Sequence, residues 1–323
     1  MLINLHDITI QQAQNFLQYA IAPRPIAFVS SIDTNGNVNL SPFSFFNLFS
    51  TNPPIVIFSP SRRIRNNTTK HTLDNVKEVP EVVINIVSYE IVQQTSLASC
   101  EYPKEVDEFV KAGFTKEEAT LVKPPLVKES PVKLECKVLE IKELGTDAGS
   151  GNLVICEVLC MHIDERILNV DRTMIDQAKL HHAARLGGDW YCKVTEQNLF
   201  KLVKPSTKLG IGFDNLPHSV LRSNILTGNH LAQLANVEAM PAMDDTFNNV
   251  GLKFILKEYQ HNPVKMKHEL HFLAAQLLNN GYIEDAWQVL LRHPDAYSTS
   301  ATEEETLRNA TNDSLFNDHH KVV

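Results

Sequence analysis

The residues best suited to chemistry lie between Ser61 and Lys70, where the chain reads SRRIRNNTTK. This segment precedes a stretch of helical spacing that begins near Lys70 and ends before Pro80. Guanidinium, ammonium, hydroxyl and helix N-terminal amide groups together can bind a phosphate group. Arginines alone would be more typical of a solvated loop, so the threonines and the lysine that follow them favour a phosphate site.

A second chemical signal lies upstream, in residues 38–46. Phenylalanines there are mixed with short amide and hydroxyl side chains instead of charges, namely Asn39, Ser41, Ser44 and, just after the run, Asn47. Such a surface can stack on a flat aromatic ligand and hydrogen-bond its polar edges, although at least half of the phenylalanines must face a core. A ring site beside a phosphate site indicates a nucleotide or flavin mononucleotide (FMN) as the ligand.

The elements that must position these residues are predicted strands. Runs 26–31, 38–46 and 55–59 form an antiparallel meander, because turn signals separate them. Further strand patterns cover residues 81–88, 131–144 and 153–167, with a short one at 190–194. About six main strands with antiparallel connections favour a β-barrel over a doubly wound parallel sheet. No GxGxxG follows a strand, which argues against the usual dinucleotide site.

Helical patterns occupy the remainder of the chain. Residues 174–186 are predicted to form a helix that Gly187 and Gly188 end. The other helical segments follow Pro205: residues 219–237, 245–260, 263–280 and 283–292. We therefore expect a mainly β domain with some helices at 1–205, a C-terminal helical extension at 206–297 and a disordered polar tail at 298–323.

Composition limits the possible partners and compartment. The chain has 323 residues, 43% of them hydrophobic, and a formal net charge of −8. An acidic protein lacks the basic face that nucleic acid or an anionic membrane requires, so neither is expected as a partner. We find no signal sequence and no stretch of membrane-spanning length. Five scattered cysteines argue against a disulfide framework and favour a reducing, cytoplasmic location.

Several other residues invite functional readings that we do not favour. A metal cluster could be imagined from residues that lie near one strand end and in one helix: His162, Asp164, Glu165, His181 and His182. Only an assumed proximity unites them, so we predict satisfied polar positions and no metal site. Cys156 and Cys160 are predicted to share one strand face with Val158, as small core residues.

Taken together, the segments RPIAFVSS, NLSPFSFFN, NPPIVIFSPSRR, NNTTKHTLDN and KLHHAARLGG resemble the flavin reductase-like FMN-binding split-barrel family. The resemblance runs in continuous order over roughly residues 20–193. It implies an antiparallel split β-barrel that forms a homodimer, with FMN bound non-covalently at each dimer-related groove. Members of this family include NAD(P)H-dependent flavin reductases and flavoprotein electron carriers.

The resemblance also implies the site residues. The isoalloxazine ring and ribityl chain would contact Ser41, Phe43, Ser44 and Asn47, and the phosphate would contact Arg65, Thr69, Lys70 and Thr72. Their expected neighbours are Ser30, Ser31, Asn39 and Ser59. His182 is predicted at the cofactor rim near Arg185, and either Arg185 or the charged segment before Gly113 would hold the phosphates of NADH or NADPH. One departure stands out, because His71 occupies the place where the family pattern has an aspartate.

FMN chemistry would require no reactive side chain, since the flavin N5 carries the hydride and the protein binds and orients it. The sequence contains no GxSxG and no HExxH, and we predict no catalytic residue. The first interpretation is an NAD(P)H-dependent flavin reductase. The alternatives are an FMN-holding electron carrier or sensor, and a barrel that binds another phosphorylated ligand and uses its helical extension for protein interaction.

Overall fold

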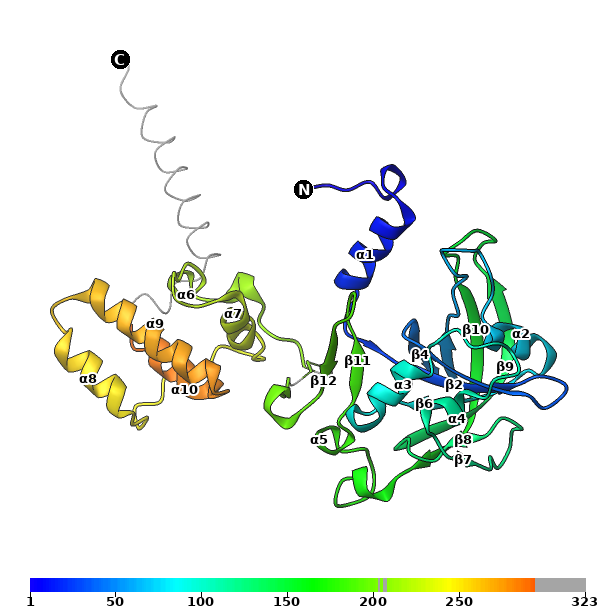
Figure 1. The fold of residues 1–323 in the computed structure, drawn as a ribbon. Coiled ribbons are helices and arrows are strands. Elements are labelled where there is room, and N and C mark those ends of the chain that lie inside the picture. The colour runs from blue at the N-terminus through cyan, green and yellow to red at the C-terminus, as the bar shows by residue number, and fades with distance from the viewer. Residues whose placement is uncertain (203, 206–207, 294–323) are drawn as a thin grey trace, which may run out of the picture. The chain divides into compact units, whose positions relative to one another are not determined.

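A computed structural model describes residues 1–202, 204–205 and 208–293 (Figure 1). The chain divides into two compact units, Met1–Phe200 and Lys201–Val323. The tail predicted at 298–323 lies outside the described residues, and the boundary predicted at residue 205 stays a prediction. Among the described helices, none combines the length and apolar character needed to cross a membrane.

The first unit is built on a seven-stranded antiparallel sheet with the order β3-β2-β6-β9-β10-β5-β4. Its strands are β2 (Ala27–Ile32), β3 (Val38–Phe43), β4 (Phe46–Thr51), β5 (Pro54–Phe58), β6 (Glu81–Ile86), β9 (Val132–Glu143) and β10 (Asn152–Ile163). Within the described residues, β3 and β4 are consecutive in the chain yet form the two ends of this order without pairing. The sheet is therefore split between them.

The single strand predicted at residues 38–46 is wrong, because the chain forms β3 and β4 there with a bend at Ser44 and Phe45. Pro42 lies near the end of β3 and has no N–H to donate. A proline is tolerated in β3 because β3 is an edge strand, paired on one side with β2 only. The bend delivers β4 to the opposite end of the sheet.

Hydrophobic clusters cover both faces of β2, as strand alternation requires. Ala27 and Val29 join the cluster that includes Phe58 and Leu73, and α2 (His71–Glu78) packs on this side. Phe28 belongs to the other cluster, to which the segment carrying α3 (Val92–Leu97) and α4 (Glu108–Ala112) contributes. The N-terminus of α2 is thereby held against the sheet beside β2 and β3.

Smaller elements complete this unit. They are α1 (Ile10–Ala20), a three-stranded sheet of β1 (Arg24–Pro25), β11 (Ala183–Arg185) and β12 (Tyr191–Lys193), the β7 (Lys116–Glu117) and β8 (Leu126–Val127) pair, and α5 (Gln177–Leu180). The helix predicted at 174–186 is wrong over most of its length. It ends at His181, whose φ of 48° is left-handed, and the residues that follow pair with β1 and β12 instead.

The second unit is helical and has its own core. Its helices are α6 (His218–Leu221), α7 (Gly228–Ala235), α8 (Val250–Glu258), α9 (Pro263–Asn279) and α10 (Ile283–Leu290). Fully buried Trp287 belongs to its hydrophobic cluster, in which every residue belongs to this unit. The helix predicted at 219–237 is two helices, because Ser223 accepts backbone hydrogen bonds in the connecting turn and Thr227 caps α7.

Candidate functional site

Between β5 and α2, residues 61–70 form a cationic turn. Hydrogen bonds from two of its arginines hold the turn in shape. Arg62 Nε donates to Asn67 Oδ1 at 2.6 Å, and its Nη2 donates to the Asn67 carbonyl at 2.6 Å. Arg63 Nη1 donates to Thr68 Oγ1 at 2.9 Å. Asn67 has a positive φ of 53°, which asparagine tolerates better than most residues. The basic segment is thus an ordered loop that presents its cations beside α2.

The N-terminus of α2 lacks a side-chain cap. Lys70 occupies the cap position, and its ammonium group cannot accept the hydrogen bonds that the first helical N–H groups offer. Burial and then the charges of Arg63 and Arg65 lower the pKa of Lys70. Both arginines lie within ion-pair distance of Glu101, whereas Lys70 has no carboxylate partner in the described part of the chain. The first N–H groups of this helix and the Lys70 ammonium group together can bind an anion.

His71 is the first residue of α2. Burial lowers the pKa of His71, and the nearby charge of Arg63 lowers it further, so the neutral imidazole is favoured. Asp74 lies in the first turn of the helix and accepts a hydrogen bond from Thr69 Oγ1 at 3.1 Å. The aspartate that the family pattern has at the first position of α2 is therefore replaced by His71. Asp74, the acidic residue in the first turn, accepts a hydrogen bond from Thr69 instead.

A buried polar network fixes α2 against the sheet. Asn39 Nδ2 donates to Thr72 Oγ1 at 3.0 Å, and Asn75 Nδ2 donates to Ser31 Oγ at 3.1 Å. All four residues are buried. The structure therefore brings the predicted site residues Ser31, Asn39 and Thr72 together at the first turn of α2, where they orient the helix terminus.

The β3–β4 bend lies between two pockets. Ser44 lines one of about 190 Å³, together with Thr95, Ser96, Ser99, Arg185 and Tyr191 among others. Phe45 lines another of about 380 Å³, whose wall includes α1 residues and Arg62 of the cationic turn. Within the described residues, the hydroxyl groups of Ser41 and Ser44 make no hydrogen bond to the protein. These hydroxyls are free to bind a ligand.

Other predicted site residues have structural partners. Phe43 is buried, and its ring centroid lies 5.4 Å from that of Phe58. Ser30 Oγ donates to the Pro125 carbonyl at 2.5 Å. Ser59 is also buried, and its Oγ accepts a hydrogen bond from the Asn152 N–H at 3.1 Å.

Two further predicted site residues lie at the surface, where each interacts with a neighbouring residue of the protein. Asn47 is exposed, and its Oδ1 accepts a hydrogen bond from the next residue's N–H at 2.8 Å. Arg65 is exposed and pairs with Glu101. Unlike Asn39, neither side chain has a hydrogen-bond partner on α2 among the described residues.

The predicted rim residues lie around the small three-stranded sheet. His182 forms a β-bridge with Ser88, and its buried Nε2 atom has no hydrogen-bond partner among the described residues. Burial lowers the pKa of His182, which favours the neutral ring. The Arg185 guanidinium lies 4.5 Å from the centroid of the Tyr191 ring. Arg185 and Tyr191 line the pocket that contains Ser44, whereas His182 is not among the residues that line it.

Sequence reasoning missed Arg24, which organises the N-terminal side of the site. Its Nη1 donates to the Gln18 carbonyl at 2.6 Å, and its Nη2 donates to the Leu186 carbonyl at 2.8 Å. Arg24 is also aligned with Arg185 in the β1–β11 pair. The tripeptide Pro23-Arg24-Pro25 gave no signal of this role, because the carbonyl groups that Arg24 binds belong to Gln18 of α1 and to Leu186, which is distant in sequence.

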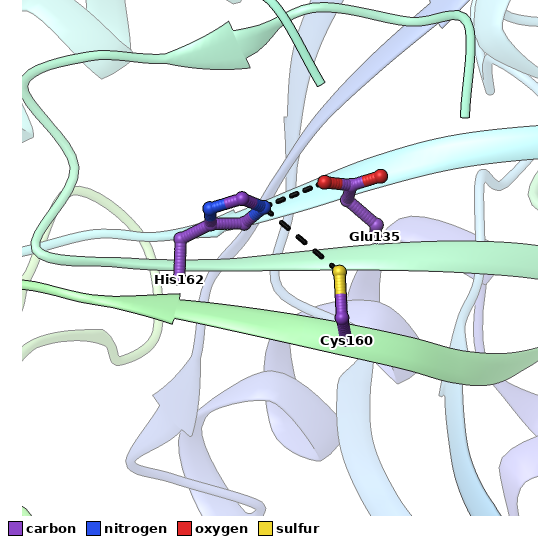
Figure 2. Close-up of side chains that lie close together, drawn as sticks. All are labelled: Glu135, Cys160 and His162. Atoms are coloured by element: carbon purple, nitrogen blue, oxygen red, sulfur yellow. Dashed lines mark hydrogen bonds and ion pairs between the residues drawn. The ribbon is translucent and has the colours of Figure 1, made fainter. Parts of the chain in front are cut away.

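The imagined metal cluster does not assemble in the described residues. Asp164 is paired with Arg166, and His181 Nδ1 lies 2.7 Å from Glu90 Oε1. His162 instead lies beside Glu135 and Cys160 (Figure 2).

Comparison with known proteins places this geometry in context. Residues 19–178 match the family described as Flavin reductase like domain. An uncharacterized protein of Aquifex aeolicus is 36% identical over 173 residues, which are 54% of this chain and 85% of that protein. The solved structure of nitrilotriacetate monooxygenase component B from Bacillus cereus is 30% identical, with a TM-score of 0.58, and the match covers 62% of this chain and 98% of that one. A Shewanella frigidimarina structure, assigned as a flavin reductase with a split barrel domain, is 26% identical over 62% of this chain and 95% of its own, with a TM-score of 0.53.

Proposed function

This chain belongs to the flavin reductase-like domain family, and from that premise we propose that it binds FMN and passes hydride from NADH or NADPH to the flavin. The split-barrel fold with a C-terminal helical extension, predicted from the sequence, is confirmed. The family and the fold do not define how the ligand binds or which electron donor is used, so we argue both from the residues of this chain.

The observation that carries the proposal is the uncapped N-terminus of α2 beside Lys70. A phosphate there would accept hydrogen bonds from the first helical amides and neutralise the half-buried ammonium group. Arg63 and Arg65 would share the same anion, in competition with Glu101. The arrangement suits a terminal phosphate such as that of FMN.

The ring would lie along the end of β3, where the hydroxyls of Ser41 and Ser44 have no hydrogen-bond partner among the described residues. When bound, FMN supplies a ring that accepts and releases hydride at N5. The protein's part is to bind and orient it: the two serines would hydrogen-bond its polar edge, while buried Asn39 and Thr72 fix the phosphate end relative to β3.

The nicotinamide donor would bind in the pocket that Ser44 lines. Its wall carries the hydroxyls of Thr95, Ser96 and Ser99 and the guanidinium of Arg185. Guanidinium and hydroxyl groups suit the phosphates of a dinucleotide. Because Ser44 belongs to this pocket and to the β3–β4 bend, the donor would meet the flavin there.

We further propose that two copies of the chain pair through exposed apolar side chains of the split sheet. Large apolar side chains are exposed on two of its strands: Leu48 and Phe49 on β4, and Leu159 and Met161 on β10. β4 is also a sheet edge with one side unpaired, which favours association. The cytoplasm is the compartment that we propose, since all five cysteines are free.

The proposal is tested by mixing the protein with FMN and either NADH or NADPH and following absorbance at the nicotinamide band. Consumption that depends on both protein and flavin is expected. Flavin that stays bound while neither nucleotide is consumed would favour the electron carrier instead. A protein whose melting temperature does not rise with added FMN would contradict flavin binding altogether, because a ligand of the native state must stabilise it.

A further inference from the structure

Glu135, Cys160 and His162 point three different donor atoms at one another (Figure 2). His162 Nε2 lies 2.6 Å from Glu135 Oε1 and 3.9 Å from Cys160 Sγ. The oxygen, nitrogen and sulfur atoms all lie within 4.8 Å of one another. None of the three residues belongs to the proposed flavin site.

The geometry excludes a nucleophile relay. In a Cys-His-acid relay one ring nitrogen faces the sulfur and the other faces the carboxylate. Here the same nitrogen, His162 Nε2, faces both Cys160 and Glu135. The three donors therefore surround a common point, which is the arrangement of ligands around an ion.

An irregularity in the β9–β10 ladder creates this convergence. Val158 pairs with Cys136, whereas Cys160 pairs with Glu135, so one extra residue is accommodated on β10 between them. The prediction that Cys156 and Cys160 share a core face is therefore wrong. Cys156 lies in the core cluster, while the bulge turns Cys160 to the face that carries Glu135.

Glu135 is already an ionised ligand. Its side chain is buried and accepts hydrogen bonds from the N–H groups of Thr120 at 2.8 Å, Leu121 at 2.5 Å and Val122 at 3.1 Å. Burial opposes ionisation, but these hydrogen bonds and the one with His162 outweigh it and lower the pKa of Glu135 to about 2. The carboxylate is thus charged and fixed in place before any ion arrives.

We propose that Glu135, Cys160 and His162 form a binding site for a zinc-class divalent ion, with a water molecule as the fourth ligand. One thiolate, one imidazole and one carboxylate form a donor set that zinc accepts in tetrahedral geometry. The ion takes the place of the proton between Oε1 and Nε2, and that proton moves to Nδ1 of the same ring. The ion separates Oε1 and Nε2 to about 3.3 Å, as bonds of roughly 2.0–2.1 Å require.

The surroundings permit that adjustment. The His162 side chain is 32% exposed, so the ring can shift and solvent can reach the fourth position. The Cys160 thiol loses its proton to solvent when the sulfur binds the ion, so one proton is released per ion bound. The bound ion would brace residues 120–122, which hydrogen-bond Glu135, against the β9–β10 hairpin.

Metal titration of the full-length protein tests this site. After chelator treatment and dialysis, zinc is titrated against a chromophoric competitor into wild type and into Cys160→Ser, His162→Asn and Cys192→Ser variants. We expect one zinc per chain, a loss of affinity of more than about 10–100-fold in the first two variants, and no change in the third. Cys192 is the matched control, because it is free and partly buried like Cys160.

A second measurement uses the wild-type protein only, so it remains valid even if a variant fails to fold. Zinc should slow the alkylation of Cys160 by iodoacetamide, read by peptide mass spectrometry, while Cys192 reacts at an unchanged rate. Failure of wild type to bind stoichiometric zinc would overturn the proposal. So would equal protection of both cysteines, or zinc retained at full affinity by Cys160→Ser and His162→Asn.

Discussion

Lys70 is the cation of the phosphate site that the protein itself leaves unpaired among its described residues. We predict that Lys70→Ala weakens FMN binding by about 1.5–3 kcal/mol, the range for a hydrogen bond to a charged group. Isothermal titration at moderate salt measures this directly.

Lys77→Ala is the matched control, because Lys77 lies on the same helix but pairs with Glu143 at 2.7 Å. Its FMN affinity should equal that of wild type. A dissociation constant that Lys70→Ala leaves unaltered would remove Lys70 from the phosphate site.

Glu135 is expected to make the free energy of unfolding decrease as the pH falls below 4.5. Its pKa in the folded protein is about 2, below the ordinary value of 4.5, so its contribution is present above pH 4.5 and is lost as pH falls toward 2. Glu135→Gln should lower the free energy of unfolding at pH 7 by about 1–3 kcal/mol, the cost of poorly satisfied buried donors. Urea unfolding with chelator present should show this difference shrinking between pH 4.5 and pH 2.5. A difference that is constant over that range would contradict the assignment.

Among the elements, α1 is held by contacts with a glycine pair that follows β11. A Cβ at Gly187 would overlap the Tyr19 ring at the end of α1. We predict that Gly187→Ala displaces α1 and lowers the free energy of unfolding by about 1–3 kcal/mol, as overpacking does. Hydrogen exchange of residues 10–20 should accelerate. Gly228→Ala is the control, since a Cβ there meets no atom within 4 Å, and exchange in α1 that does not respond to Gly187→Ala would show that Tyr19 simply turns aside.

Elements with strong local signals were predictable from the sequence. The helix that follows Lys70 and the two long strands agree with α2, β9 and β10, because periodicity and turn residues define them locally. The strand β11 was not predictable, since Ala183–Arg185 has helical composition and becomes extended only through pairing with β1 and β12. Tertiary pairing there overrides local propensity.

Some residues of the candidate site were likewise predictable from the sequence, and others were not. Lys70 and Asn39 were predicted from their residue types and neighbours, and Thr72 from the family resemblance. The structure brings the three residues together at the first turn of α2, and their ligand stays a prediction. Glu135 and Cys160 could not be joined to His162 in advance. The three side chains converge because of a single bulge in the β9–β10 pair, and no residue pattern in β10 predicts that bulge.

At the scale of the whole molecule, the exposed apolar side chains of β4 and β10 predict a dimer. Light scattering after size exclusion should give twice the chain mass for wild type. Phe49→Glu should give monomers, because Phe49 is 63% exposed on the edge strand and a buried charge there would disfavour pairing. Phe254→Glu is the control, since Phe254 is 61% exposed on α8 of the second unit and should leave the dimer intact. A monomeric wild type at tens of micromolar would contradict the prediction.

The two units each have a hydrophobic core of their own, and every residue of the proposed flavin site belongs to the first unit. Its most direct test compares FMN with riboflavin, which lacks the phosphate, in calorimetric titrations of the flavin-free protein. One FMN per chain should bind, with riboflavin weaker by at least about tenfold, because the charge-assisted phosphate contacts contribute 1.5 kcal/mol or more. Equal affinities for the two flavins, or binding of neither, would contradict a phosphate site at the N-terminus of α2.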